Sequence, residues 1–115
     1  MTNYCKLYNI NLRDYKLDEN SIKNSYRWFE HIEIKRYLKK DNSYIEVGGK
    51  LGSKNYFVCY YCDGELHREN GPAFIEVKNG ELIECLYQIH GKAHNIYGPA
   101  VISITDNNIY ETWMI

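Results

Sequence analysis

A chain of 115 residues, 44% hydrophobic and 25% charged, is long enough for one domain over residues 1–115 and too short for a second. Its net charge of −1 excludes the strongly basic composition of a dedicated nucleic-acid-binding protein. The sequence shows neither an apolar run of membrane-spanning length nor a secretory signal, which predicts a cytoplasmic protein without membrane insertion whose four cysteines are reduced.

The first 50 residues are expected to contain a strand, at 3–12, and one helix. Within residues 19–40, larger side chains recur at helical spacing: Ile22, Tyr26, Phe29, Ile32 or Glu33, and Tyr37. Asp18 or Ser21 can cap the start of this segment, and Lys39 and Lys40 suit its end, so it predicts a helix lying on a sheet. Residues 29–38 also alternate and are rich in β-branched side chains, so a strand there is the alternative.

A hairpin is predicted next, from residues 44–47 and 56–61 around the loop GGKLGSKN. The segment YIEV at 44–47 echoes FIEV at 74–77, which relates this hairpin to the one that follows it.

The second half of the chain contains an internal repeat. Shifting the sequence by 27 residues places residues 58–84 over 85–111 without a gap. Eight positions are identical: Tyr60/Tyr87, Gly64/Gly91, His67/His94, Gly71/Gly98, Pro72/Pro99, Ala73/Ala100, Ile75/Ile102 and Glu84/Glu111. The repeat predicts two consecutive copies of one supersecondary unit.

Turn residues divide each copy into strands. Asp63-Gly64 and Asn79-Gly80 are typical two-residue hairpin turns, and His90-Gly91 and Asp106-Asn107 are their equivalents in the second copy. The predicted strands are residues 56–62, 73–77, 82–89, 100–105 and 109–114.

Both prolines lie in a Gly-Pro-Ala triplet four residues after a histidine. Proline is tolerated at the first residue of a strand, where its missing N–H costs no ladder bond, and glycine permits the preceding turn. Each histidine is then placed to bond loop carbonyls. We therefore assign a structural role at these corners to His67, Gly71, Pro72, His94, Gly98 and Pro99.

Alternation along the strands separates two faces of the sheet. The predicted core face carries Val58, Tyr60, Cys62, Ala73, Ile75, Val77, Cys85, Tyr87, Ile89, Ala100, Ile102 and Ile104. The other face mixes aromatic, apolar and polar residues: Phe57, Cys59, Tyr61, Phe74, Glu76, Leu86, Gln88, Val101, Ser103 and Trp113. This mixed face is either half covered by the N-terminal segment or a binding surface, whose candidate residues are Tyr61, Phe74, Glu76, Gln88 and Trp113.

The pattern G-x-x-H-x-x-x-G-P-A in 27-residue units resembles the MORN-like repeats of bacterial, phage and giant-virus proteins, often written H-R-x-x-G-P-A. The first copy matches at Gly64, His67, Arg68, Gly71, Pro72 and Ala73, whereas the second has Asn95 in place of the arginine. The resemblance covers residues 56–115 and implies a hairpin-built antiparallel sheet used for binding, without a defined chemistry. The predicted fold is thus α+β and mainly β, an antiparallel meander of hairpin repeats with one N-terminal helix packed on it.

Two patterns could bind other ligands. Cys59, Cys62, His90 and His94 have the pair spacings of a zinc finger, which keeps a small zinc-binding protein as a second alternative function. However, 27 residues separate the pairs and the repeat aligns the cysteines with apolar residues, so we expect no metal and no other cofactor. Lys35, Arg36, Lys39 and Lys40 form a basic cluster at the end of the predicted helix, which leaves a nucleic-acid-binding accessory protein as the alternative function.

No arrangement of nucleophile, base and orienting group is recognisable, so we do not expect an enzyme. The favoured function is protein binding through the mixed face and the strand edge at residues 113–115, which a partner or a second copy could extend. The composition indicates an AT-rich genome. By analogy with anti-CRISPR proteins, the chain is interpreted as a phage or mobile-element inhibitor of a host defence protein, acting in the bacterial cytoplasm.

Overall fold

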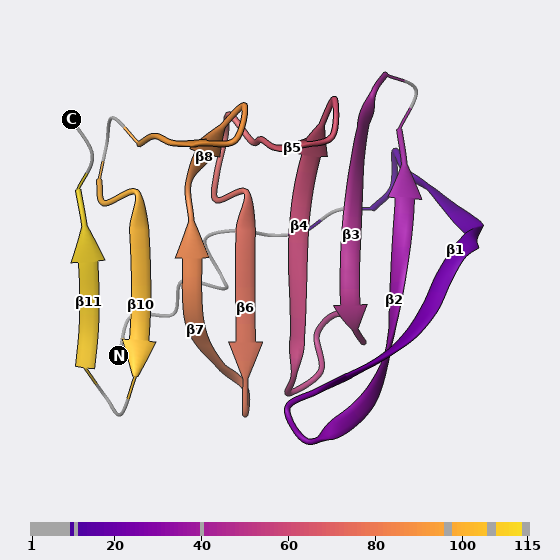
Figure 1. Cartoon of the computed structure of the whole chain (residues 1–115), viewed down its shortest axis with the longest axis horizontal. Helices are drawn as coiled ribbons and strands as arrows, with labels where there is room; N and C mark the ends of the chain where they lie inside the picture. Colours follow the sequence, from indigo (N-terminus) through magenta and orange to yellow (C-terminus); the bar gives the residue numbers. More distant parts are fainter. Residues whose placement is uncertain (1–9, 11, 40, 96–97, 106–107, 114–115) are drawn as a thin grey trace.

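The computed structural model describes residues 10, 12–39, 41–95, 98–105 and 108–113. Over these residues the chain forms a nine-stranded antiparallel sheet in the order β1-β2-β3-β4-β6-β7-β10-β11, with β5 paired to β4, and a separate β8-β9 pair (Figure 1). The strands are β1 (Lys16–Arg27), β2 (Glu30–Leu38), β3 (Ser43–Gly49), β4 (Tyr56–Cys62), β5 (Glu65–Leu66), β6 (Phe74–Lys78), β7 (Glu81–Leu86), β8 (Gln88–Ile89), β9 (Lys92–Ala93), β10 (Val101–Thr105) and β11 (Asn108–Thr112).

The predicted helix over residues 19–40 is wrong: the described residues contain no helix, and this segment is the β1–β2 hairpin. The first three residues of the predicted helical stripe are not buried, because Ile22, Tyr26 and Phe29 are 38%, 61% and 90% exposed. The alternation of Ile32 and Ile34 prevails, since Ile32 is buried against Phe57. The antiparallel sheet itself is confirmed, whereas the expected strand at residues 3–12 lies outside the described residues except for Ile10 and Leu12, which are not in a strand.

The predicted hairpin turns are confirmed where the structure describes them. Asp63-Gly64, Asn79-Gly80 and His90-Gly91 all have positive φ at both positions, as a type I′ turn requires. Asp106-Asn107 lies outside the described residues. The hairpin β3–β4 also forms as expected, and the predicted strand 82–89 is divided into β7 and β8.

The two Gly-Pro-Ala corners make equivalent hydrogen bonds. The amide of Tyr60 donates to the carbonyl of Ala73 at 2.7 Å, and that of Tyr87 to Ala100 at 2.8 Å. In the first corner Arg68 Nη1 donates to the carbonyl of Pro72 at 3.3 Å, and in the second Asn95 Nδ2 donates to that of Pro99 at 2.9 Å. The arginine and the asparagine thus each donate a side-chain N–H to the carbonyl of the proline in their own corner.

The second hairpin lacks an irregularity that the first one has. In β6–β7 the register shifts between Glu76/Glu84 and Val77/Leu82, whereas β10–β11 pairs without interruption from Val101/Thr112 to Thr105/Asn108. Glu111 therefore lies opposite Ile102 and shares its face. Trp113 lies just beyond β11, where continued alternation from Glu111 would place it on the core face instead of the mixed face to which the 27-residue shift assigns it.

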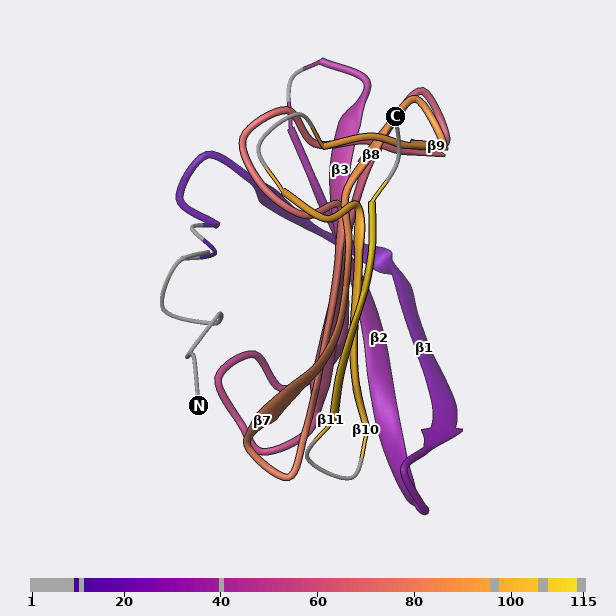
Figure 2. The same cartoon turned by 90° about the vertical axis from the view of Figure 1, so that its left-hand side faces the viewer.

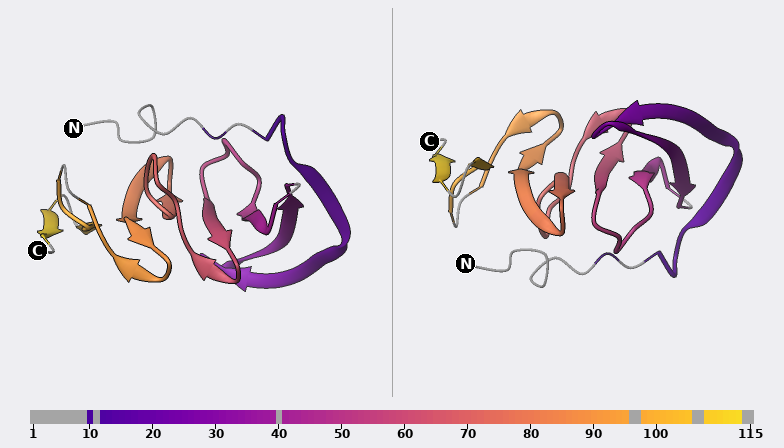
Figure 3. Two further views of the ribbon diagram at one scale, coloured as in Figure 1. Left: turned by 90° about the horizontal axis from the view of Figure 1, so that it is seen from above. Right: turned by 90° about the horizontal axis from the view of Figure 1, so that it is seen from below.

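Both faces of the sheet are covered at the end near β2–β4 (Figures 2 and 3). Ile10, Leu12 and Tyr15 pack on the face of Ile45, Val47 and Val58. The β1–β2 hairpin curls over the opposite face, where Trp28 and Ile34 pack around Ile32, Phe57 and Cys59. At this end, side chains are therefore buried on both faces of the sheet.

Most of the predicted core face is confirmed as buried: Val58, Ala73, Ile75, Val77, Cys85, Ala100, Ile102 and Ile104. Four members of that prediction are only half-buried: Tyr60, Cys62, Tyr87 and Ile89. Phe57 and Cys59, expected on the mixed face, are buried beneath the β1–β2 hairpin. Among the described residues no helix has the length and apolarity to cross a membrane.

Candidate functional site

The tip of the β1–β2 hairpin occupies part of the predicted binding face. The Glu76 carboxylate on β6 accepts hydrogen bonds from Trp28 Nε1 at 2.9 Å and Arg27 Nη2 at 3.0 Å. The guanidinium of Arg27 lies 5.0 Å from the centre of the Phe57 ring, and Phe57 stacks on Phe74 at 6.3 Å. Phe74 and Glu76 are therefore used within the fold, and we call this arrangement of Arg27, Trp28 and Glu76 the clasp.

The other predicted binding residues lie apart from the clasp and from one another. Tyr61 stacks on Tyr44 with ring centres 4.8 Å apart. The carbonyl of Gln88 accepts the amide hydrogen of Arg68, and Gln88 itself pairs with Ala93 in the small sheet. Trp113 is exposed beyond the end of β11. The structure thus divides these residues among the clasp, the strand ends and the sheet edge.

The predicted basic cluster is divided by the strand that replaces the helix. Lys35 and Arg36 are consecutive residues of β2, so their side chains point to opposite faces. Lys35 lies near Glu33, at 3.7 Å, whereas Arg36 lies over the Tyr44 ring and 3.8 Å from Glu46. Lys39 lies 5.7 Å from the Tyr15 ring centre, and Lys40 is outside the described residues. A continuous basic surface is therefore absent from the described part of this segment.

The cysteines and histidines of the weak zinc pattern do not come together in the described part of the chain, where no group of three or more metal-ligating side chains occurs. Cys59 is buried under the hairpin, and burial raises the pKa of its thiol to about 12. A thiol that stays protonated at neutral pH is a poor nucleophile and a poor metal ligand.

The side chain of His67 makes a contact other than the expected bond to a loop carbonyl. His67 Nδ1 accepts the backbone N–H of His90 at 3.0 Å, and the two rings lie 4.3 Å apart. This bond joins the first corner to the turn of the second copy, in line with a structural use of the histidine.

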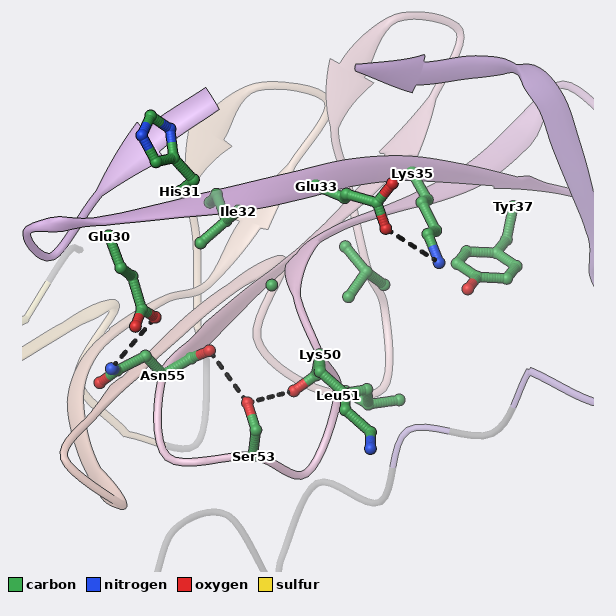
Figure 4. Close-up of a pocket in the computed structure, with 12 residues that line it drawn as sticks. Glu30, His31, Ile32, Glu33, Lys35, Tyr37, Lys50, Leu51, Ser53 and Asn55 are labelled. Atoms are coloured by element: carbon green, nitrogen blue, oxygen red, sulfur yellow. Dashed lines mark hydrogen bonds and ion pairs between the residues drawn. The ribbon is translucent and has the colours of Figure 1, made fainter. Parts of the chain in front are cut away.

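Two open pockets lie at the end of the sheet near β2–β4. The larger, about 650 Å³, lies between β2 and the loop after β3 (Figure 4). Some of its polar groups pair with one another, as with Lys35 and Glu33 or Asn55 Nδ2 and Glu30. The smaller, about 510 Å³, is lined by four tyrosines together with Arg68, which lies 4.0 Å from the Tyr60 ring centre.

The two edges of the sheet differ in how they are protected. Between Asp18 and Lys23 of β1 four residues lie opposite one residue of β2, and Ser21 Oγ bridges the gap by accepting the Arg36 amide at 2.8 Å. Charged side chains and bulges of this kind prevent pairing with another chain. β11 has neither a bulge nor a lysine, and its side chains are all exposed.

Exposed aromatic side chains gather at two places in the described residues. One is the β11 edge, where Ile109, Tyr110 and Trp113 are 47%, 59% and 62% exposed. The other is the β1–β2 turn with Phe29. Sequence reasoning identified the C-terminal edge but missed Phe29, because Trp28-Phe29 has none of the residues that mark a turn.

Glu76 of the clasp lies opposite Glu84 on β7, and the repulsion between these two carboxylates can be tested. Burial and the charge of Glu76, which pairs directly with Glu84, raise the pKa of Glu84. A carboxyl with a raised folded-state pKa favours folding when protonated, so its contribution decreases as pH rises above the unfolded value of about 4.3. We expect Glu84→Gln to stabilise the protein at pH 7 by about 0.5 kcal/mol, since solvent screens this half-exposed pair.

Urea unfolding at pH 7 and pH 4 measures this effect, and the gain from Glu84→Gln should vanish at pH 4. Glu81→Gln is the control, because Glu81 lies opposite Lys78 and its charge is favourable. An equal gain from both variants, or a gain that persists at pH 4, contradicts the assignment.

In comparisons with protein-family models, curated proteins and solved structures, nothing matches this chain.

Proposed function

We propose that this chain is a non-enzymatic protein-binding module whose partner adds an extended segment to the edge of β11. The observation that carries the proposal is the contrast between the two sheet edges. β1 is interrupted and charged, whereas β11 is regular, exposed and, within the described residues, paired only with β10. An edge of this kind presents N–H and C=O groups that a partner strand can bind.

The hydrogen-bonding pattern identifies the backbone groups available at this edge. The carbonyl of Thr112 accepts the amide hydrogen of Ala100 at 2.8 Å, so Thr112 directs its backbone groups toward the β10 side. Because direction alternates along a strand, Tyr110 does the same, whereas Ile109 and Glu111 direct theirs outward. The side chains of Ile109 and Tyr110 are exposed and point to opposite faces of the sheet. Each would then make apolar contacts with side chains of the added strand on its own face.

We expect Glu111→Pro to abolish partner binding without unfolding the protein, because proline removes an outward N–H and leaves the ladder to β10 intact. Glu111→Ala is the matched control: it removes the same carboxylate but keeps the N–H, so it should bind like the wild type. The measurements are affinity capture from a bacterial lysate with the three proteins, thermal unfolding of each, and hydrogen exchange of residues 109 and 111 with and without the captured partner.

Capture that survives Glu111→Pro, or that both variants lose equally, rules out strand addition at this edge. Sedimentation over a range of concentrations tests a second copy as the occupant. A dimer that Glu111→Pro dissociates and Glu111→Ala preserves would identify that occupant.

In its finer form, the proposal is that the partner is a host defence protein and that this chain, encoded by a phage or mobile element, inhibits it in the host cytoplasm. The support comes from sequence: residues 42–115 carry nine acidic against five basic residues, a balance suited to the basic groove of a nucleic-acid-processing enzyme. Phage plating on a host with and without its defence system, with wild type or Glu111→Pro expressed, tests this form. Equal protection by both proteins contradicts it.

A further inference from the structure

The turn between β1 and β2 has an unfavourable backbone for its residues. Trp28 and Phe29 are its two central residues, with φ of 54° and 63°. Bulky residues rarely adopt positive φ, because the side chain crowds the following carbonyl. At the three other turns of the described residues in which consecutive residues have positive φ, the second residue is glycine. The β1–β2 turn therefore has an aromatic pair where the backbone conformation alone would favour Asn-Gly.

The fold explains one of these two aromatic residues and not the other. Trp28 packs against Phe57, with ring centres 6.2 Å apart, and its N–H bonds Glu76 in the clasp. Phe29 is the most exposed of the large hydrophobic residues in the described chain. Its strain and exposure both cost stability without a compensating contact in the fold, a combination that is concentrated at functional sites.

The surroundings of Phe29 make the tip a rigid aromatic projection. The clasp fixes one side of the hairpin to β6 through Arg27 and Trp28. On the adjoining pair of the hairpin the exposed Tyr26 ring contacts His31 edge-on, with ring centres 5.1 Å apart. Because these contacts fix the hairpin that carries Phe29, binding through its ring would order the side chain and little of the backbone, which lowers the entropy cost as expected of an interface hot spot.

We propose that Phe29 is the anchor of a second protein-binding site, at the β1–β2 turn that crosses over β4 and β6 and apart from the β11 edge, and that its ring inserts into an apolar pocket of a partner protein. The charge of Arg27 is matched by Glu76, while Glu30 beside the turn has a hydrogen bond to Asn55 and, among the described residues, no ion pair. The residue that follows Phe29 therefore carries a negative charge that no ion pair among the described residues balances, which fits a partner pocket with a basic rim and disfavours an anionic lipid surface.

The test begins with stability, which needs no partner. Phe29→Gly and Phe29→Asn should each raise the melting temperature by about 4 °C, because glycine and asparagine accept positive φ. Phe29→Leu keeps both the strain and an apolar side chain, so it should leave the melting temperature within about 2 °C of wild type. A lower melting temperature for Phe29→Gly would overturn the claim that Phe29 costs stability.

Binding is tested with a photo-cross-linking phenylalanine analogue incorporated at position 29 in the full chain, expressed in a bacterial host. We expect a discrete protein adduct that added wild-type protein or Glu111→Pro suppresses and that added Phe29→Gly does not. Failure of wild-type protein to suppress the adduct, or equal suppression by Phe29→Gly, would overturn the anchor. Suppression by Phe29→Gly but not by Glu111→Pro would assign the same adduct to the β11 edge, which keeps the two proposals distinguishable.

Vesicles of phosphatidylglycerol test the other class of target. We expect the wild-type protein not to sediment with them. Co-sedimentation that Phe29→Gly abolishes would show that the tip inserts into membranes and would overturn the protein pocket.

Discussion

Replacing Gly48 by alanine is expected to destabilise the protein by about 3 kcal/mol and to lower its melting temperature by about 10 °C. Gly48 pairs with Phe57 across β3 and β4, and a methyl group at position 48 would overlap the Phe57 ring. The ring cannot move away, because Trp28 and Arg27 cover it from the hairpin. Overpacking at this point would therefore displace the clasp along with the ring.

Thermal unfolding monitored by circular dichroism measures the loss. Gly98→Ala is the control, since its new methyl group would lie 3.4 Å from Asn95 Nδ2, an ordinary contact distance. A Gly48→Ala protein as stable as Gly98→Ala would mean that the Phe57 ring does not rest on the glycine.

Trp28→Ala should be nearly as costly, at about 3 kcal/mol, because it removes an aromatic contact and a charge-assisted hydrogen bond together. Without the indole, Phe57 loses part of its cover and Glu76 keeps only Arg27 as a bonded donor among the described residues. Hydrogen exchange should accelerate at the β1–β2 tip before it does so in β6 and β7.

Tyr26→Ala provides the comparison in the same hairpin, since Tyr26 is exposed and its described ring contact is with His31. Its replacement should cost less than about 1 kcal/mol. If Trp28→Ala and Tyr26→Ala cost the same, the clasp does not hold the hairpin to the sheet.

The strands of the repeated half could be predicted because short stretches of sequence determine its turns and the faces of its strands. Turns such as Asn79-Gly80 need only two residues of a particular type, and alternation then places Ile75 and Cys85 on the buried face. The face of Trp113 could not be predicted from the repeat. It depends on the shift in pairing near Val77, which the second copy lacks although its sequence aligns without a gap.

The prediction for the N-terminal half was wrong because its sequence fits both a helical periodicity and the alternation of a strand. Ile22, Tyr26 and Phe29 suggest a helix, yet their side chains find no surface to cover. The turn that joins the two strands has Trp28-Phe29 in place of glycine or asparagine, so turn propensities do not predict a turn there. Once the hairpin forms, Glu76 receives donors from 48 and 49 residues away in sequence, and a predicted binding residue becomes part of the fold.

The shared corner bond has a consequence for how such units diverge. A long charged side chain in one unit and a short amide in the other reach the same proline carbonyl. The structural requirement at this position is thus a hydrogen-bond donor within reach of the carbonyl, which either residue meets. Relatives of this chain would be recognised more reliably by spacing and donor chemistry than by the arginine itself.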